Sequence, residues 1–207
     1  MALVDVDLPH PSRMRGGWAA LAAVFGARGW QREAWAAPDE WFYHDGGGNW
    51  ASLRFVEQDK LVLIGHDHEY SETYFREAAK YFGEEETDLL RGAPDWWASK
   101  LDRPLLGEWI GFIYGWNGHR WQRADYDKPD GFDQVGLLQA CSLTDMTALE
   151  QSAADAPDLD GLPPGDSLRA LVAADAEITH ELLARAVPGW DIGAGVAAAR
   201  RFREMRL

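Results

Sequence analysis

The sequence predicts an α+β fold: a curved antiparallel meander sheet of about five strands, with helices packed on one face and a helical C-terminal segment. Hydrophobic residues make up 46% of the 207 residues and include 11 tryptophans, enough apolar surface for a packed core. Short strand-like segments follow one another across glycine-containing turns, as in hairpins. Helical segments lie between and after these hairpins rather than after every strand, which favours α+β over a parallel α/β sheet.

A helix over residues 11–25 is expected first. Ser12 can cap its N-terminus, and Gly26 or Gly29 can end it. Its apolar positions recur at helical spacing: Trp18, Leu21, Ala22 and Phe25. Three strands should follow: residues 40–44, 49–56 and 61–66. The segments between them, residues 45–48 with three glycines and residues 57–60, have the length and composition of hairpin connections.

The middle of the chain should contain a helix from Ser71 to Gly83 and a short helix around residues 95–97. The first of these helices should bury one broad apolar face, made of Tyr74, Phe75, Ala78, Ala79, Tyr81 and Phe82. A second hairpin, with strands at 108–116 and 119–124, is predicted by Asn117-Gly118, because this dipeptide favours the positive φ angles of a two-residue turn. In such a turn Trp116 pairs with His119. A further strand is expected at residues 135–142.

The C-terminal part should be helical. Residues 155–166 contain three prolines and four aspartates and have the composition of a linker. We therefore expect an α+β core domain at 1–154 and a helical segment at 167–207 that packs on this core. Within that segment, helices are predicted at residues 167–186 and 191–205 from their apolar spacing.

Three histidines are expected to meet at one end of the sheet. In a simple register Ala51 lies opposite His66 and Asn49 opposite His68, which puts His44, His66 and His68 on one face. Three imidazoles at a strand end can hold zinc and leave one position open for water. A slip of one residue in the register would separate them.

The histidine cluster has three interpretations. In the first it holds one divalent metal, zinc as first choice, that activates water in a hydrolysis, with Asp67 or Glu69 as orienting group or general base. In the second it is a structural hydrogen-bond network with no cofactor, and in the third a metal-free acid–base pocket. The structural network is favoured, because two histidines separated by one residue are a weak pattern.

Tryptophans and acidic residues predict a binding surface. Only one of Trp96 and Trp97 can point inward on a short helix, and Trp116 and His119 flank the predicted turn, where side chains are usually exposed. The expected surface comprises these aromatic and acidic residues: Trp96, Trp97, Trp116, His119, Glu84, Glu85 and Glu86. The alternative is that the tryptophans are ordinary core residues.

The formal charge of −14 argues against binding to nucleic acid or to an anionic membrane, and it favours a basic protein partner. There is no phosphate-binding loop and no serine-nucleophile motif. The first residues lack the pattern of a secretion signal, so a cytoplasmic location is expected. We predict a cytoplasmic protein-binding module.

The combination of small size, acidity and aromatic surface resembles that of bacterial immunity proteins, a class of small cytoplasmic α+β proteins that neutralise a cognate toxin. The resemblance implies an immunity-type inhibitor or a regulatory partner of a basic protein. The hydrolase built on the histidine cluster is the alternative from a different functional class.

Overall fold

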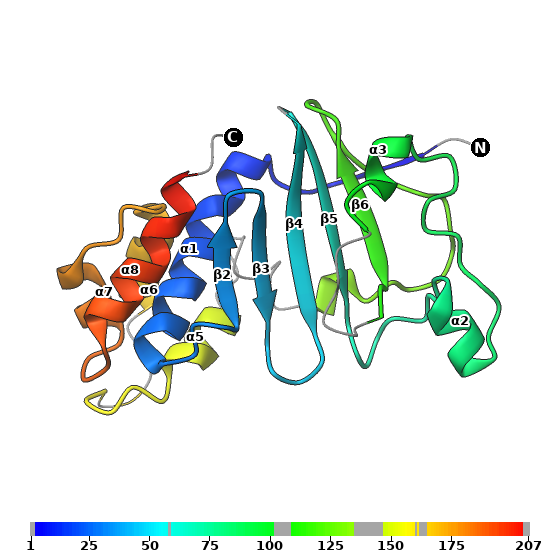
Figure 1. The fold of residues 1–207 in the computed structure, drawn as a ribbon. Helices are drawn as coiled ribbons and strands as arrows, with labels where there is room; N and C mark the ends of the chain where they lie inside the picture. Colours follow the sequence, from blue (N-terminus) through cyan, green and yellow to red (C-terminus); the bar gives the residue numbers. More distant parts are fainter. Residues whose placement is uncertain are drawn as a thin grey trace. The chain divides into compact units, whose positions relative to one another are not determined.

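The computed structural model describes residues 3–57, 59–101, 109–134, 147–159, 161 and 165–204. The fold is α+β with antiparallel strands, as predicted (Figure 1). The chain divides into two compact units that are interleaved in the sequence. One comprises residues 1–8 and 44–135, the other residues 9–43 and 136–207. The domain boundaries expected at 154 and 166 stay a prediction, and the strand expected at 135–142 lies outside the described residues.

The first unit is built on antiparallel strands in the order β1-β7-β6-β5-β4. Their bounds are β1 (Val4–Val6), β4 (Trp50–Glu57), β5 (Lys60–His66), β6 (Phe112–Trp116) and β7 (Trp121–Arg123). Strand β1 was not predicted, because three residues are too few to show an alternating pattern. It is held by β7, with Val4 opposite Arg123 and Val6 opposite Trp121.

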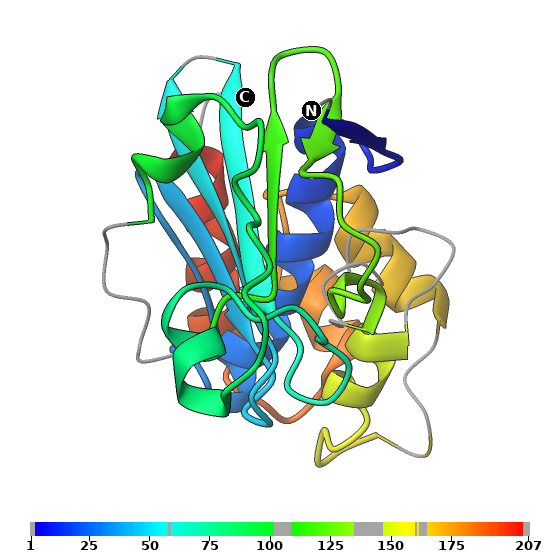
Figure 2. The same cartoon turned by 90° about the vertical axis from the view of Figure 1, so that its right-hand side faces the viewer.

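The two faces of these strands are packed by different segments. On one face Phe132, from the short 3-10 helix η1 (Phe132–Gln134), lies 4.9 Å from the ring of Phe112 and 4.8 Å from that of Tyr114. On the other face Trp97 of α3 (Asp95–Ala98) occupies the space that a side chain at Gly115 would need. Figure 2 shows α3 on the side of the strands opposite to η1. Glycine at position 115 therefore makes room for the indole.

The register of the β4–β5 hairpin differs from the prediction by one residue. Ala51 pairs with Gly65, and Trp50 pairs with His66. Gly65 is fixed on the face of Ala51 because a Cβ atom there would lie 2.4 Å from the ring of Phe112, which covers it. The slip moves His66 to the opposite face, as alternation requires. The predicted grouping of His66 with Ala51 is wrong.

The β6–β7 hairpin differs from the prediction by two residues. Trp116 pairs with Trp121 instead of His119, and the backbone N of Asn117 donates to the O of Arg120 at 3.3 Å. The side-chain oxygen of Asn117 accepts from the backbone N of His119 and of Arg120, both at 3.1 Å, and Gly118 has a φ of 90°. Because a shift of two residues preserves alternation, Trp116 and Trp121 share one face, as do Tyr114 and Arg123.

The helix expected from Ser71 to Gly83 is shorter than predicted. It is α2 (Glu77–Phe82), and it ends at Gly83, as expected. The preceding residues, 71–75, are not helical, because they bind other segments. The hydroxyl of Thr73 donates to the O of Gly111 at 2.5 Å, and the backbone N of Thr87 donates to the O of Tyr74 at 2.8 Å. The α2 helix therefore has only six residues, and it follows a segment that is hydrogen-bonded to other parts of the unit.

The second unit is built around α1 (Pro11–Arg28), which is buried along most of its length and ends at Gly29 with a φ of 91°. The other elements are β2 (Ala34–Ala37), β3 (Glu40–His44), α5 (Thr147–Ala153), α6 (Gly165–Ala173), α7 (His180–Ala186), α8 (Ile192–Arg200) and η2 (Arg201–Glu204). Helices α1 and α8 lie side by side (Figure 1). Their backbones approach closely at Gly195, where a Cβ atom would lie 2.4 Å from the O of Ala23.

Candidate binding surface

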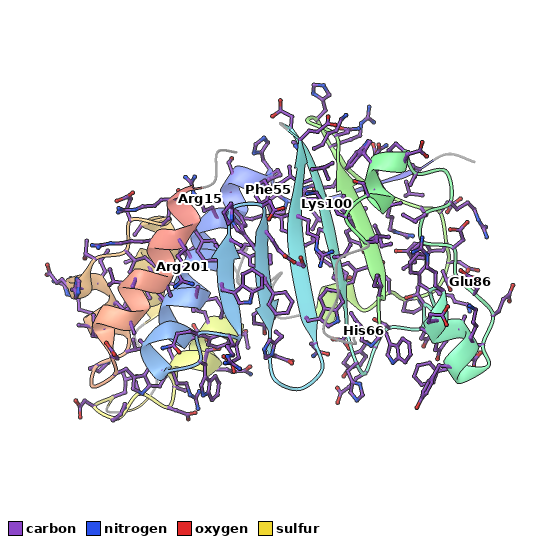
Figure 3. The ribbon with its side chains drawn as sticks, viewed as in Figure 1. Arg15, Phe55, His66, Glu86, Lys100 and Arg201 are labelled. Atoms are coloured by element: carbon purple, nitrogen blue, oxygen red, sulfur yellow. The ribbon has the colours of Figure 1, made fainter. Side chains whose placement is uncertain are left out.

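The three candidate metal ligands are not brought together. The Nδ1 of His44 accepts a hydrogen bond from the backbone N of Gly46 at 3.1 Å. His68 is exposed, and its backbone N donates to the side chain of Asn49 at 2.7 Å. His66 is half-buried at the end of β5 (Figure 3). Among the described residues no group of three or more His, Cys, Asp or Glu side chains could hold a metal ion. The described residues therefore offer no set of three ligands for a metal-dependent hydrolase.

The two candidate general bases, Asp67 and Glu69, lie in different environments. Asp67 is 1% exposed, and its Oδ1 accepts from the backbone N of Glu69 at 2.9 Å and of Tyr70 at 2.8 Å. Ser71 adds to this turn, since its hydroxyl accepts from the backbone N of Asp67 and donates to the O of Asp130. Glu69 is exposed. Asp67 thus stabilises the turn after β5 rather than orienting an imidazole.

At this end of β5, His66 has a strongly shifted pKa. Burial lowers its pKa from 6.5 to about 4; the charge of Asp67 opposes this shift, and that of His68 adds to it. Its Nδ1 is buried and has no hydrogen-bond partner. The charged form of the ring is therefore unfavourable in the folded state.

We expect His66 to make the folded state sensitive to acid. Because its folded pKa is below the unfolded value, the unfolded chain takes up the proton first, and stability is lost as the pH falls from about 6.5 towards 4. The loss is at most about 3.5 kcal/mol, at ~1.4 kcal/mol for each pH unit of the shift. Urea unfolding of the wild type and of His66→Gln between pH 7 and 4.5 measures it. Parallel profiles for the two proteins would contradict this assignment.

Two of the aromatic residues expected on the surface are buried. Trp97 is 1% exposed and Trp116 is 6% exposed. Trp97 faces inward over Gly115, and the ring of Trp116 lies 5.6 Å from that of Trp121 on the strand face. The expectation that they are exposed anchors is wrong. Trp96 is half-buried, and His119 is exposed in the β6–β7 turn.

A different set of aromatic residues lies on and beside α2. We call Tyr74, Tyr81, Phe82 and Trp109 the α2 aromatic patch. Tyr81 is 74% exposed and Phe82 is 51% exposed, whereas Tyr74 and Trp109 are half-buried. Neighbouring ring centroids of the patch are separated by 5.0 to 5.6 Å, including Tyr81 to Trp109 at 5.3 Å and Tyr74 to Phe82 at 5.6 Å. Each ring packs against at least one other ring of the patch, so the patch is already formed in the free chain.

Acidic residues adjoin the patch. Glu84, Glu85 and Glu86 follow α2 directly and are exposed, and Glu86 is labelled in Figure 3. The segment that carries them is paired with the patch, because the backbone N of Thr87 donates to the O of Tyr74. Within the described part of the chain none of these three carboxylates forms an ion pair. They are therefore available to a partner.

A hollow of about 390 Å³ lies beside this segment. Its charged lining residues are Glu85, Glu86, Asp88, Asp125 and Asp127, together with the basic Arg91 and Lys128. The Nζ of Lys128 lies 5.9 Å from the ring centroid of Tyr74. The hollow, which we call the acidic hollow, is thus adjacent to the α2 aromatic patch through Tyr74.

One wall of the acidic hollow is fixed by a tyrosine–carboxylate network. The hydroxyls of Tyr126 and Tyr114 both donate to Oδ2 of Asp130 at 2.7 Å. Burial, with the negative charge of Asp130 next in importance, raises the pKa of both tyrosines far above its ordinary value of 10. Both hydroxyls therefore stay protonated donors. They hold in place the segment that carries Asp125, Asp127 and Lys128.

The first unit, which carries this surface, holds most of the net negative charge of the protein. Residues 1–8 and 44–135 hold 20 of the 34 acidic side chains and 10 of the 20 basic ones, so that the first unit carries −10 of the total −14. A field of this sign attracts cationic partners and raises their association rate.

Tyr81, Phe82 and Trp109 were not predicted as surface residues. Tyr81 and Phe82 were assigned to the buried side of the predicted longer helix. An available signal is the run of three glutamates that begins two residues after Phe82.

None of the helices in the described regions is long and apolar enough to cross a membrane. Comparisons with models of protein families, with curated proteins and with solved structures each found no match.

Proposed function

We propose that this protein binds a basic segment of another protein through the α2 aromatic patch and the acidic residues beside it. The observation that carries the proposal is the exposure of Tyr81 and Phe82, 74% and 51%, in a patch of contacting rings next to carboxylates that form no ion pair with a described residue. A single exposed aromatic residue is ordinary. A contiguous apolar patch with a polar rim is typical of interaction sites, and aromatic residues dominate their binding energy.

Electrostatics supports a basic partner. Glu84, Glu85 and Glu86 would lie at the rim of the contact, where charges act mainly on the association rate and on the choice of partner. The net charge of −10 on the first unit acts over a longer range in the same direction. We propose an immunity-type inhibitor or a regulatory partner of a basic protein as the biological form of this activity.

Selection of phage-displayed peptides on the immobilised protein tests the proposal and needs no identified partner. The Tyr81→Ser/Phe82→Ser double variant serves for counter-selection, because it removes the patch from an exposed site and leaves the core intact. We expect the enriched peptides to combine arginine or lysine with an apolar residue and to bind more weakly as salt is raised. Enriched peptides without net positive charge, or with equal affinity for the double variant, would refute the proposal.

The proposal that the protein is an immunity-type inhibitor can be tested further when a partner protein has been identified. If that partner is a toxin, co-expression of the wild-type chain should restore growth, and co-expression of the double variant should not. Equal rescue by both chains would show that inhibition does not use the patch.

A further inference from the structure

We infer that the acidic hollow receives one cationic side chain of the bound segment, with arginine preferred, and that Lys128 holds this position in the free chain. The inference rests on the proposed function and adds the identity of one partner residue. It also assigns to Lys128 a role in setting affinity. Three features support it: the position of the hollow, its charge, and the contact between Lys128 and Tyr74.

The acidic hollow and the α2 aromatic patch can be contacted by one short segment. Lys128 lines the hollow, and its Nζ is 5.9 Å from the ring centroid of Tyr74. The ring of Tyr74 is in turn 5.6 Å from that of Phe82. An apolar side chain on the patch and a cationic neighbour in the hollow therefore require only a few residues of partner chain. The hollow, about 390 Å³, is within the range of ligand-binding sites.

The chemistry of the lining favours a guanidinium group. Glu85 and Glu86 form one group of acidic residues and Asp125 and Asp127 another, and none of the four forms an ion pair in the described part of the chain. A guanidinium can bind two carboxylates through its several N–H donors while its plane stacks on an aromatic ring. An ammonium group has the charge but lacks the planar donor geometry. Tyr126 lines the hollow, and the ring of Tyr74 lies 5.9 Å from the Nζ of Lys128 in its wall.

In the free protein, the ammonium group of Lys128 lies where we expect the cationic group of the partner to bind. It is half-exposed, forms no ion pair with a described residue, and has its ammonium group within cation–π distance of Tyr74. A partner cation must displace this group or share the hollow with it. Removing Lys128 should therefore strengthen binding beyond the effect of the change in net charge.

A matched pair of variants separates the two effects. Lys128→Met and Lys60→Met each remove one positive charge from the first unit, but Lys60 pairs with Glu57 on the β4–β5 connection and does not line the hollow. The probe is acetyl-Trp-Arg-amide, and acetyl-Trp-citrulline-amide is its neutral isostere. Backbone amide shifts recorded during titration of the labelled protein report both the location and the dissociation constant.

The expected result is that the arginine probe shifts amides within residues 84–91 and 125–128. We expect Lys128→Met to lower its dissociation constant about threefold or more, as for the loss of one competing cation–π contact, and Lys60→Met to change it less than about 1.5-fold. The citrulline probe should bind more weakly to all three proteins.

The inference is overturned if the two variants have equal effects, or if the two probes bind equally well. If shifts then remain at Tyr81 and Phe82, the proposed function stands without a cation in the hollow. If neither the patch nor the hollow responds to the arginine probe, both proposals fail.

Discussion

Replacing Tyr81 and Phe82 together by serine should weaken the binding of a selected basic peptide by at least about thirtyfold, or ~2 kcal/mol. The two rings are the most exposed members of a preformed patch, so their removal takes away the apolar anchor without opening a cavity in the core. Isothermal titration calorimetry measures the affinity. Circular dichroism and urea unfolding should show an unchanged fold, because both side chains are exposed.

Tyr70→Ser is the control for this prediction. Tyr70 is 54% exposed in the same unit and has no ring contact with a described residue, so its replacement removes a similar exposed aromatic side chain outside the patch. We expect its affinity for the peptide to be within about twofold of the wild type, as for most surface positions outside a hot spot. Equal losses for both proteins would show that the effect does not depend on the patch.

The largest loss of stability is expected for Gly115→Ala. A Cβ atom at this position would lie between 2.1 and 2.3 Å from three atoms of the indole of Trp97, which is 1% exposed. The indole would have to move off the face of β6, so we expect the free energy of unfolding to fall by about 3 kcal/mol, the upper range for overpacking. Urea unfolding followed by tryptophan fluorescence measures the change.

Two further variants test the cause of this loss. Gly193→Ala adds the same methyl group on the exposed side of α8 and should be neutral or slightly stabilising, because alanine is the better helix former. Combining Gly115→Ala with Trp97→Leu should cost less than the sum of the two single changes, since the smaller side chain relieves the clash. A cost below about 1 kcal/mol for Gly115→Ala would contradict the tight packing of Trp97 on β6.

Elements with strong local signals could be predicted from the sequence. The helix α1 has a regular apolar pattern and ends at Gly29, where a positive φ favours glycine. The strands β3, β4 and β5 were located from β-rich segments separated by turn residues. By contrast, α2 was predicted too long, because hydrogen bonds that join Thr73 to Gly111 and Tyr74 to Thr87 keep the preceding segment from being helical.

Strand register could not be predicted, because it depends on contacts between residues far apart in the sequence. The pairing of Ala51 with Gly65 is fixed by the ring of Phe112, which comes from the next strand of the sheet. The resulting slip of one residue moved His66 to the other face. The predicted histidine cluster depended on this register and is lost with it.

The exposure of the acidic residues could be predicted from the sequence, whereas that of the aromatic residues could not. The acidic run of Glu84, Glu85 and Glu86 is exposed, as the expectation required, and it remains part of the proposed surface. The aromatic component was assigned to the wrong residues: Trp97 is drawn inward by the space over Gly115, whereas Tyr81 and Phe82 are on the outside of a helix only six residues long. Such exposure depends on which faces the tertiary structure covers.

Amide chemical-shift mapping with the tightest selected peptide locates the surface that binds the peptide. The protein should be labelled uniformly and titrated at low and at high salt. We predict shifts that concentrate in residues 74–91, 109 and 125–128 and that require higher peptide concentrations at high salt. Shifts centred outside these residues, for example on the groove beside Trp35 and Arg201 in the second unit, would show that the α2 aromatic patch is not the binding surface.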